Sequence, residues 1–222
     1  MTKAALFDLD GVIADTAAYH LQAWHKLVQD HFGLDAPADL LAQTKGLSRT
    51  DSLAAILSGL DLTVTDDEFT QLAAEKNALY QQLLANLNED SILPGIADLL
   101  AALRKKGFRL ALASASHNAP LILDKLGLSG TFDAIADPRK VAHGKPAPDI
   151  FLAAAKGVGC QPEDCIAFED SAAGIAAIKA AGSCAVGVGQ QAARQADIGF
   201  PDTAALDLDQ ILAQINRKKS AG

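Results

Sequence analysis

The order of apolar and polar positions divides the chain into a repeating part and one long exception. In the repeating part, apolar runs of strand type alternate with segments of helical spacing. The first predicted strand begins at residue 4, and the others cover 109–113, 134–136, 165–168 and 184–188. The predicted helices between them cover 95–106, 119–126, 149–157 and 172–181. Strands that alternate with helices predict a parallel sheet with helices on both faces.

The exception is an interval in which every pattern is helical and no strand-like run occurs. Residues 16–32 predict a helix that Gly33 ends, and a long helix is predicted over 66–88. Capping boxes are predicted before two helices of this interval, at Ser48 with Asp51 and at Thr65 with Glu68.

Because this helical interval follows the first strand directly, we expect an insertion in an α/β protein. The predicted core is a Rossmann-like parallel sheet built from residues 1–15 and 88–222, and the predicted α-helical cap domain covers 16–87. The cap would cover the carboxyl ends of the strands, where α/β proteins bind ligands. Residues 15–17 and 86–91 are the expected hinge.

One cation interrupts the apolar stripe of the long helix. Lys76 lies four residues after Leu72 and three before Leu79, so its side chain leaves the helix on the core face. Such a lysine usually extends its ammonium group to solvent. If a cleft lies on that side, the ammonium group has a second use as an anion ligand.

Composition narrows the class of protein. The 222 residues are 50% hydrophobic, enough for a full core, and the net charge of −8 argues against nucleic-acid or general membrane partners. No segment predicts a signal peptide or a membrane span, so we expect a cytoplasmic protein. We also expect a monomer. The cysteines, 160, 165 and 184, lack metal-type spacing and are expected to be reduced thiols.

The first strand ends in candidate chemistry. Asp8 and Asp10 are two residues apart, so both side chains can project from one end of the sheet, and Gly11 allows a sharp turn. Two carboxylates at such a distance repel each other unless a cation lies between them or one is protonated. Taken alone, the pair is also compatible with a solvated strand end.

Further motifs in order make the catalytic interpretation more specific. The D-x-D-G pattern after an apolar strand, followed by Ser114, by Lys145 before a proline and by Glu169-Asp170, resembles the haloacid dehalogenase superfamily of phosphoryl-transfer enzymes. The likeness implies a phosphoryl-transfer reaction in a Rossmann-like core with a cap.

Each of these residues has an expected role. Asp8 is the candidate nucleophile, because a carboxylate can attack phosphorus and hold the phosphoryl group, and Asp10 is the candidate general acid and base. Ser114 can donate to the transferring phosphoryl oxygens, and Lys145 can neutralise the charge that develops there.

A divalent cation is the expected cofactor, and Mg²⁺ suits carboxylate, carbonyl and phosphate oxygens. The favoured side-chain ligands are Asp8 and Asp170. The resemblance implies that the main-chain carbonyl of Asp10 is a further ligand, and that Glu169 binds directly or through water.

Three further parts of the sequence narrow the resemblance: the loop 45–49 with Ser52, Lys76, His20 and Trp24, the segment 113–118 and the segment 145–151. Within the superfamily, they resemble the β-phosphoglucomutases. Members of that family are isomerases that interconvert β-glucose 1-phosphate and glucose 6-phosphate through a β-glucose 1,6-bisphosphate intermediate. The implied substrate-binding residues are His20, Trp24, Lys45, Gly46, Leu47, Ser48, Arg49, Ser52, Lys76, Ala115, Ser116, His117 and Asn118. A phosphosugar and its bisphosphate are the implied partners.

The two phosphates of the intermediate explain why a mutase needs a second anion site. Arg49 offers a two-pronged donor for the phosphate that is not reacting, and Ser116 and Asn118 would complete its site from the core. Histidine at position 117, where the family usually has lysine, would contribute less charge. The alternatives are a sugar-phosphate phosphatase of the same superfamily and a non-catalytic phosphosugar-binding module.

Overall fold

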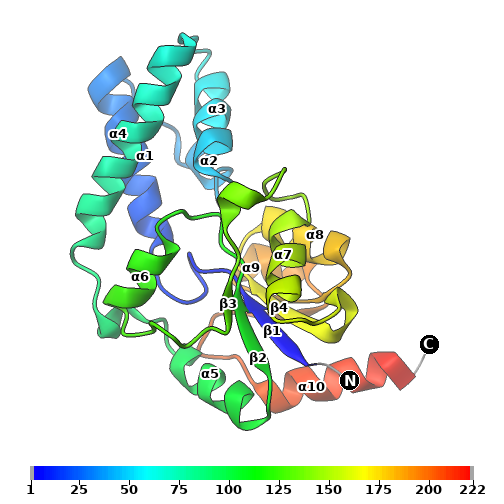
Figure 1. Cartoon of the computed structure of the whole chain (residues 1–222). Coiled ribbons are helices and arrows are strands. Elements are labelled where there is room, and N and C mark those ends of the chain that lie inside the picture. The colour runs from blue at the N-terminus through cyan, green and yellow to red at the C-terminus, as the bar shows by residue number, and fades with distance from the viewer. Residues whose placement is uncertain (1–2, 221–222) are drawn as a thin grey trace.

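The computed structural model describes residues 3–220 and consists of a sheet with helices around it and a separate block of helices (Figure 1). All neighbouring strands are parallel, and their order across the sheet is β3-β2-β1-β4-β5-β6. The strands are β1 (Ala4–Phe7), β2 (Arg109–Leu112), β3 (Ala134–Ile135), β4 (Cys165–Glu169), β5 (Cys184–Val188) and β6 (Ile198–Phe200). The predicted parallel sheet is thus confirmed.

Helices cover both faces of the sheet because successive strand residues point to opposite faces. Phe7 packs in one apolar cluster, where its ring stacks on Phe168, and Leu6 packs in the cluster on the other face. The flanking helices are α5 (Ile96–Lys105), α6 (Ala119–Lys125), α7 (Asp149–Gly157), α8 (Ala172–Ala181), α9 (Gln190–Gln195) and α10 (Leu208–Ser220). Short 3-10 turns occur at Glu89–Ser91, Pro138–Lys140 and Pro162–Asp164.

The helical block lies on the side of the sheet where β1 ends (Figure 1). It contains α1 (Ala17–Phe32), α2 (Ala38–Ala42), α3 (Arg49–Gly59) and α4 (Asp66–Leu84). The block has its own apolar cluster, which includes Trp24, Leu53 and Ile56.

The two connections between the block and the sheet run side by side. Ala14 forms a bridge with Ile92, and the Leu93 N–H donates to the carbonyl of Ile13 at 2.9 Å.

Several boundaries differ from the sequence prediction. The helix predicted over 66–88 ends at Leu84, and the chain then turns so that Leu87 is still buried. The Thr65–Glu68 capping box is present, but the Ser48–Asp51 box is only half formed. Ser48 Oγ accepts from the Asp51 N–H and donates to the Asp51 carboxylate, so that carboxylate does not cap the backbone of Ser48.

The segment after residue 190 contains a strand and two helices that we did not predict from the sequence. β6 has only three residues, too few for an alternating pattern to be visible. Ile211 and Ile215 of α10 pack in the same apolar cluster as α5, which explains why this end of the chain is ordered against the core.

The cysteines and the hydropathy agree with the sequence interpretation. The cysteines form no disulfide within residues 3–220. Across the same residues, no helix combines the length and the apolar character that a membrane crossing requires.

Candidate active site

The floor of the site is a buried group of opposite charges at the carboxyl ends of β1 and β4. The ammonium group of Lys145 donates to Asp8 Oδ1 at 2.7 Å and to Glu169 Oε2 at 2.8 Å. All three side chains are almost inaccessible to solvent. The shared lysine therefore holds two carboxylates from different strands in fixed positions.

Glu169 is also anchored on its other oxygen. Oε1 accepts hydrogen bonds from the backbone N–H groups of Asp170 and Ser171, both at 3.0 Å, and from the Ser171 hydroxyl at 2.8 Å. Because both oxygens have donors, this carboxylate fixes the end of β4 and the start of α8.

The floor offers a set of oxygen ligands that fits a hard divalent cation. Asp8, Glu169 and Asp170 each present a carboxylate oxygen, and these oxygens lie within 4.8 Å of one another. Burial, followed by the charge of Glu169, raises the pKa of Asp8 well above its ordinary value and raises the pKa of Asp170 to about 7. A cation between these groups would offset both causes of the raised pKa values, the burial of the carboxylates and their mutual repulsion.

Two contacts bring other parts of the chain close to Asp170. A Cβ atom at Gly11 would lie 1.8 Å from Asp170 Oδ2, and the φ angle of Gly11 is +84°, so only glycine fits there. From the helical block, the Lys45 ammonium group lies 2.6 Å from the same oxygen. Asp170 therefore joins the floor to the first turn of the chain and to the block.

Asp10 lies beside this floor and is held by hydroxyl groups. Its Oδ1 accepts from Thr16 Oγ1 at 2.5 Å and from the Tyr80 hydroxyl at 3.2 Å, and His20 Nε2 lies 3.7 Å away. Unlike Asp8, it has no lysine partner among the described residues. Tyr80 comes from α4, so the helical block contacts the candidate acid and base directly.

Lys76 and His20 form a pair beside Asp10. Lys76 is 1% exposed and its ammonium group binds His20 Nδ1, 4.7 Å from the Trp24 ring centroid. Burial lowers the pKa of Lys76 to about 7 and that of His20 to about 4. The imidazole is therefore neutral at pH 7, accepts from Lys76 at Nδ1 and turns its Nε2–H toward Asp10.

Lys76 does not extend to bulk solvent, because α4 faces a cavity at that position, so the condition under which it could serve as an anion ligand is met. His31, which follows the spacing of the apolar face of α1, is exposed and pairs with Glu75 at 2.5 Å.

On the opposite wall, the loop after β2 forms a chain of hydrogen bonds. Ser114 Oγ accepts from the Ser116 N–H at 3.0 Å, and Ser116 Oγ accepts from the Asn118 N–H at 3.2 Å. His117 is exposed next to them, and burial, followed by the charges of Arg49 and Arg139, lowers its pKa below the ordinary value.

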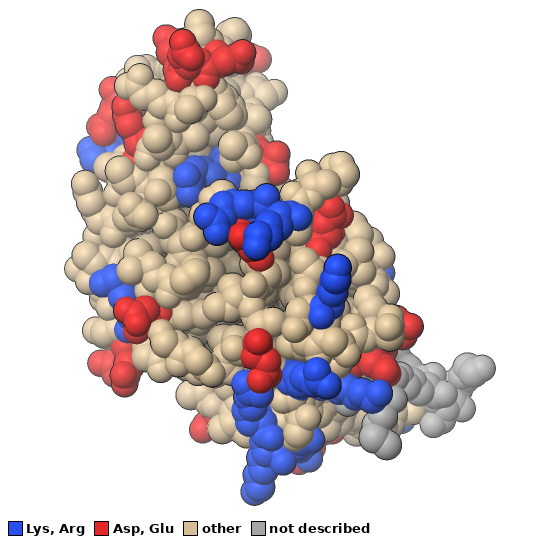
Figure 2. All heavy atoms as spheres, viewed as in Figure 1, with Lys and Arg blue, Asp and Glu red and all other residues tan. Residues whose placement is uncertain are grey.

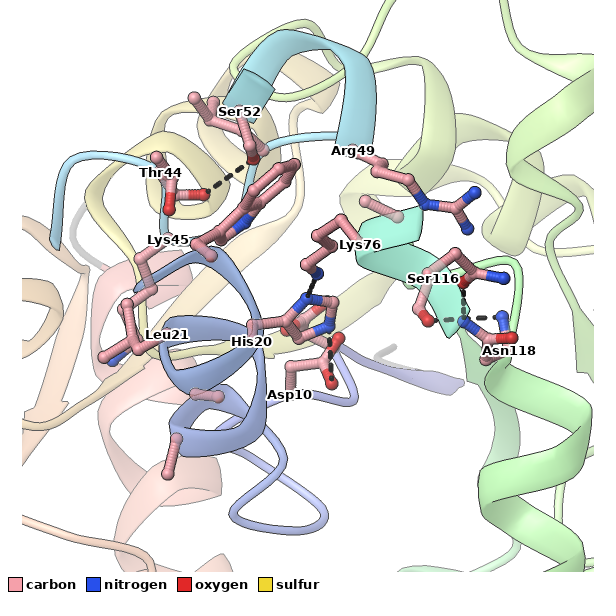
Figure 3. A pocket seen from close by; sticks show the side chains of 18 of the residues that line it. Asp10, His20, Leu21, Thr44, Lys45, Arg49, Ser52, Lys76, Ser116 and Asn118 are labelled. Atoms are coloured by element: carbon pink, nitrogen blue, oxygen red, sulfur yellow. Dashed lines mark hydrogen bonds and ion pairs between the residues drawn. The ribbon is translucent and has the colours of Figure 1, made fainter. Parts of the chain in front are cut away.

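A cavity with a volume of about 310 Å³ lies between the floor, the helical block and this loop (Figure 3). Most of the residues predicted from the sequence line it: Asp8, Asp10, His20, Trp24, Lys45, Gly46, Leu47, Arg49, Ser52, Lys76, Ala115, Ser116, His117 and Asn118. Figure 3 shows Arg49 and Lys76 on the block side, with Ser116 and Asn118 facing them from the core.

Five predicted residues do not line the cavity. Ser114, Lys145, Glu169 and Asp170 lie beneath or beside its floor, and Ser48 caps α3 and faces a second depression near His143. Lining residues that sequence reasoning missed are Asp15, Ala17, Ala18, Leu21, Ala42, Thr44 and Asn77. Their only signal is proximity in sequence to residues that were singled out.

The charge distribution suits an anionic ligand in this cavity. Although the chain carries −8, the lysine and arginine residues Lys45, Arg49 and Lys76 line the cavity. Figure 2 shows lysine and arginine atoms where the block meets the core, and further ones at the lower end of the core. Acidic atoms gather at the far end of the block (Figure 2). A local positive region in an acidic protein concentrates anions at that place.

Comparison with known proteins agrees with this geometry. The model of the haloacid dehalogenase-like hydrolase family matches residues 2–182. A β-phosphoglucomutase of Bacillus subtilis is 45% identical and the alignment covers 93% of this chain and 92% of that protein. A crystal structure of a Clostridium difficile β-phosphoglucomutase superposes with a TM-score of 0.95 at 39% identity, covering 99% of this chain and 100% of that one.

Phosphatases are also among the relatives. The fructose-1-phosphate phosphatase YqaB of Escherichia coli is 35% identical, over 82% of this chain and 94% of that protein. The family match, the parallel sheet and the acidic floor lead to one conclusion: the chain belongs to the haloacid dehalogenase-like hydrolase family.

Proposed function

We propose that this protein is a β-phosphoglucomutase that interconverts β-glucose 1-phosphate and glucose 6-phosphate. The observation that carries the proposal is a cavity with two different polar ends: the Asp8 floor, whose carboxylates can hold a cation, at one end, and the donor side chains of Arg49, Ser116 and Asn118 at the other. A sugar bisphosphate needs both ends at once. The likeness to the Bacillus subtilis and Clostridium difficile enzymes supports the same assignment.

In the first half of the proposed cycle, Asp8 carries a phosphoryl group. The 6-hydroxyl oxygen of β-glucose 1-phosphate attacks phosphorus, the bond from phosphorus to the Asp8 oxygen breaks, and Asp10 accepts the hydroxyl proton. The products are β-glucose 1,6-bisphosphate and a free Asp8 carboxylate. Thr16 and Tyr80 hold the Asp10 carboxyl group within the cavity for this transfer.

In the second half, the bisphosphate reverses its orientation. The Asp8 carboxylate attacks the phosphorus of the 1-phosphate, the bond from phosphorus to the sugar oxygen breaks, and Asp10 returns its proton to that oxygen. Glucose 6-phosphate leaves and Asp8 is phosphorylated again. In each half, Arg49 with Ser116 and Asn118 would bind the phosphate that is not reacting.

Buried charges support the transfer. Lys145, fixed between Asp8 and Glu169, keeps its positive charge because its pKa is raised by both carboxylates, so it can offset negative charge near the reacting phosphoryl group. Ser114 would donate its hydroxyl hydrogen there. Asp8, Asp170, the Asp10 carbonyl and Glu169 would hold a divalent cation, and Mg²⁺ would supply charge neutralisation to the phosphoryl oxygens.

The helical block has a proposed role as a mobile cap. We assign it residues 16–87, with hinges at 15–17 and 86–91, because the two connections run side by side. Closure would exclude water from the phosphorylated Asp8, so that the sugar hydroxyl and not water is the acceptor. We further propose a cytoplasmic monomer.

A coupled assay tests the proposal. Purified protein with Mg²⁺ and β-glucose 1-phosphate should form glucose 6-phosphate, and a trace of β-glucose 1,6-bisphosphate should increase the rate because it phosphorylates Asp8. Inorganic phosphate is measured in the same samples. Phosphate release that matches or exceeds isomerisation would favour the alternative, a sugar-phosphate phosphatase like the Escherichia coli relative.

A further inference from the structure

The side chain of Asn118 is bound at both ends by one helix of the block. Gln81 Nε2 donates to Asn118 Oδ1 at 3.0 Å, and Asn118 Nδ2 donates to Asn77 Oδ1 at 2.9 Å. Asn77 and Gln81 are four residues apart on α4, so both face the same way. Asn118 belongs to the core loop that precedes α6, so these two bonds cross from the block to the core.

This arrangement is unusual for an asparagine at the start of a helix. Asn118 is the N-cap residue of α6, a position where its side chain normally accepts from a backbone N–H of the first turn. Here it makes no such bond, and its own backbone N–H donates to Ser116 Oγ. Asn118 is 8% exposed, and its side chain makes its hydrogen bonds to α4 instead.

The two partners decide which end of the amide remains available. A carboxamide has an oxygen that accepts and a nitrogen that donates two hydrogens, whereas a phosphate dianion only accepts. Gln81 binds the oxygen and Asn77 takes one N–H, so the second N–H of Asn118 remains for a ligand. With the amide reversed, its oxygen would face a phosphate and repel it.

We propose that Gln81 and Asn77 are positioning residues for the distal phosphate, and that they orient the Asn118 amide so that an N–H faces the ligand. The inference rests on the proposed function, in which Asn118 binds the phosphate that is not reacting. It assigns a role to Gln81, which does not line the cavity and touches the site through Asn118.

The same helix, α4, also contacts the other end of the cavity. Lys76 and Tyr80 directly precede Asn77 and Gln81 on α4, and they contact His20 and Asp10. One rigid helix therefore joins the distal phosphate site to the candidate acid and base. The two hydrogen bonds of Asn118 hold α4 against the core close to the position where Tyr80 reaches Asp10.

Gln81→Met tests the inference because it removes the amide donor, keeps a long side chain and changes no group that lines the cavity. Gln82→Met is the matched control, since Gln82 is an exposed neighbour on the same helix. The readout is the dissociation constant of glucose 6-phosphate from the unphosphorylated, Mg²⁺-loaded protein, measured by titration calorimetry. Gln81→Met should weaken binding about fivefold, and Gln82→Met less than about twofold.

A double-mutant cycle separates orientation of Asn118 from a general structural effect. In the Asn118→Ala background, Gln81→Met should weaken binding less than about twofold, because no amide remains to orient. An equal loss in both backgrounds, no loss in the wild-type background, or no binding of glucose 6-phosphate by the unchanged protein would overturn the inference. Binding without conversion of β-glucose 1-phosphate would instead contradict only the proposed function.

Discussion

The floor and the helical wall of the cavity carry opposite kinds of charge and hold them differently. On the floor, Asp8 and Glu169 share the Lys145 ammonium group at 2.7 and 2.8 Å. On the wall, Lys76 has a neutral imidazole and two aromatic rings as neighbours, and burial lowers its pKa to about 7. The charges of the floor are therefore fixed by ion pairs, whereas burial in the wall lowers the pKa of Lys76 and so favours its uncharged form.

This difference suggests a division of labour. Fixed, paired charges suit bond making at one phosphorus atom, because they need no reorganisation when the reaction occurs. Cations without carboxylate partners suit a site that must receive and release a phosphate, because the arriving anion supplies the missing charge. Substitutions in the floor should therefore lower both isomerisation and the hydrolysis of acetyl phosphate. Substitutions in the wall should lower isomerisation more, because only that reaction needs a site for a second phosphate.

The largest effect is expected at Asp8. Asp8→Asn keeps the shape but removes the anionic nucleophile and a candidate metal ligand, so isomerisation should fall by about a thousandfold or more. Hydrolysis of acetyl phosphate should fall as much. Both rates are measured beside a circular dichroism spectrum. A near-normal rate in a normally folded variant would show that the floor is wrongly assigned.

Lys76→Met should raise the free energy of unfolding, because it removes a buried cation from the wall. Between pH 7 and the usual lysine pKa near 10.5, the unfolded chain binds a proton that the folded chain does not, so stability rises with pH across that window. The lowered pKa costs the folded state on the order of 5 kcal/mol at pH 6, where Lys76 is charged, and 2 kcal/mol at pH 9, where the folded protein has lost the proton. Urea denaturation should therefore show a larger gain for the variant at pH 6.

The same variant should lose isomerase activity, since the ammonium group faces the cavity. A gain in stability that does not depend on pH would mean that Lys76 is charged in the folded protein at both pH values.

Arg49→Ala should lower isomerisation much more than it lowers the hydrolysis of acetyl phosphate. The loss of a charge-assisted bidentate contact costs about 1.5–3 kcal/mol, so isomerisation should fall about ten- to a hundredfold. Acetyl phosphate has no second phosphate, so its hydrolysis should fall much less. Arg139→Ala is the control, because it removes an exposed arginine that is paired with Asp137. Equal losses of both activities for Arg49→Ala would place Arg49 at the reacting phosphoryl group.

The smallest effect is expected at His117. Because burial, followed by the charges of Arg49 and Arg139, lowers its pKa below the ordinary 6.5, the neutral imidazole is the major form at pH 8 and also at pH 6.5. His117→Lys should therefore tighten glucose 6-phosphate binding a few-fold at pH 8 and should still tighten it at pH 6.5. Titration calorimetry at pH 8, 6.5 and 5 measures this. A factor that already disappears at pH 6.5 would mean that the imidazole is charged there.

The sequence predicted the floor better than the wall, for a physical reason. Asp8, Ser114 and Glu169 lie at the carboxyl ends of parallel strands, and such ends meet at one edge of a sheet whatever the connecting loops do. The strand pattern therefore placed these residues near one another, and the resemblance to the superfamily supplied their roles. What the pattern could not give is that Lys145 reaches both carboxylates, because that depends on side-chain packing after a long loop.

The wall depends on how the helical block sits on the core, which local patterns do not encode. Lys76 was visible as a cation in an apolar stripe, but only the structure shows that it points into a cavity. The polar pair Asn77 and Gln81 carried no signal, since polar residues next to a stripe usually face solvent. Tyr80 is a buried residue of α4, a position that by itself suggests only packing, yet its hydroxyl donates to Asp10.

The central claim is that phosphate moves through Asp8 and a bisphosphate, and a single-turnover experiment tests it most directly. Protein phosphorylated on Asp8 with unlabelled acetyl phosphate is mixed, in excess, with β-glucose 1-phosphate that carries ³²P. The account predicts unlabelled glucose 6-phosphate, with the label on the protein or in the bisphosphate. Label released as inorganic phosphate, or found directly in glucose 6-phosphate during the first turnover, would contradict it.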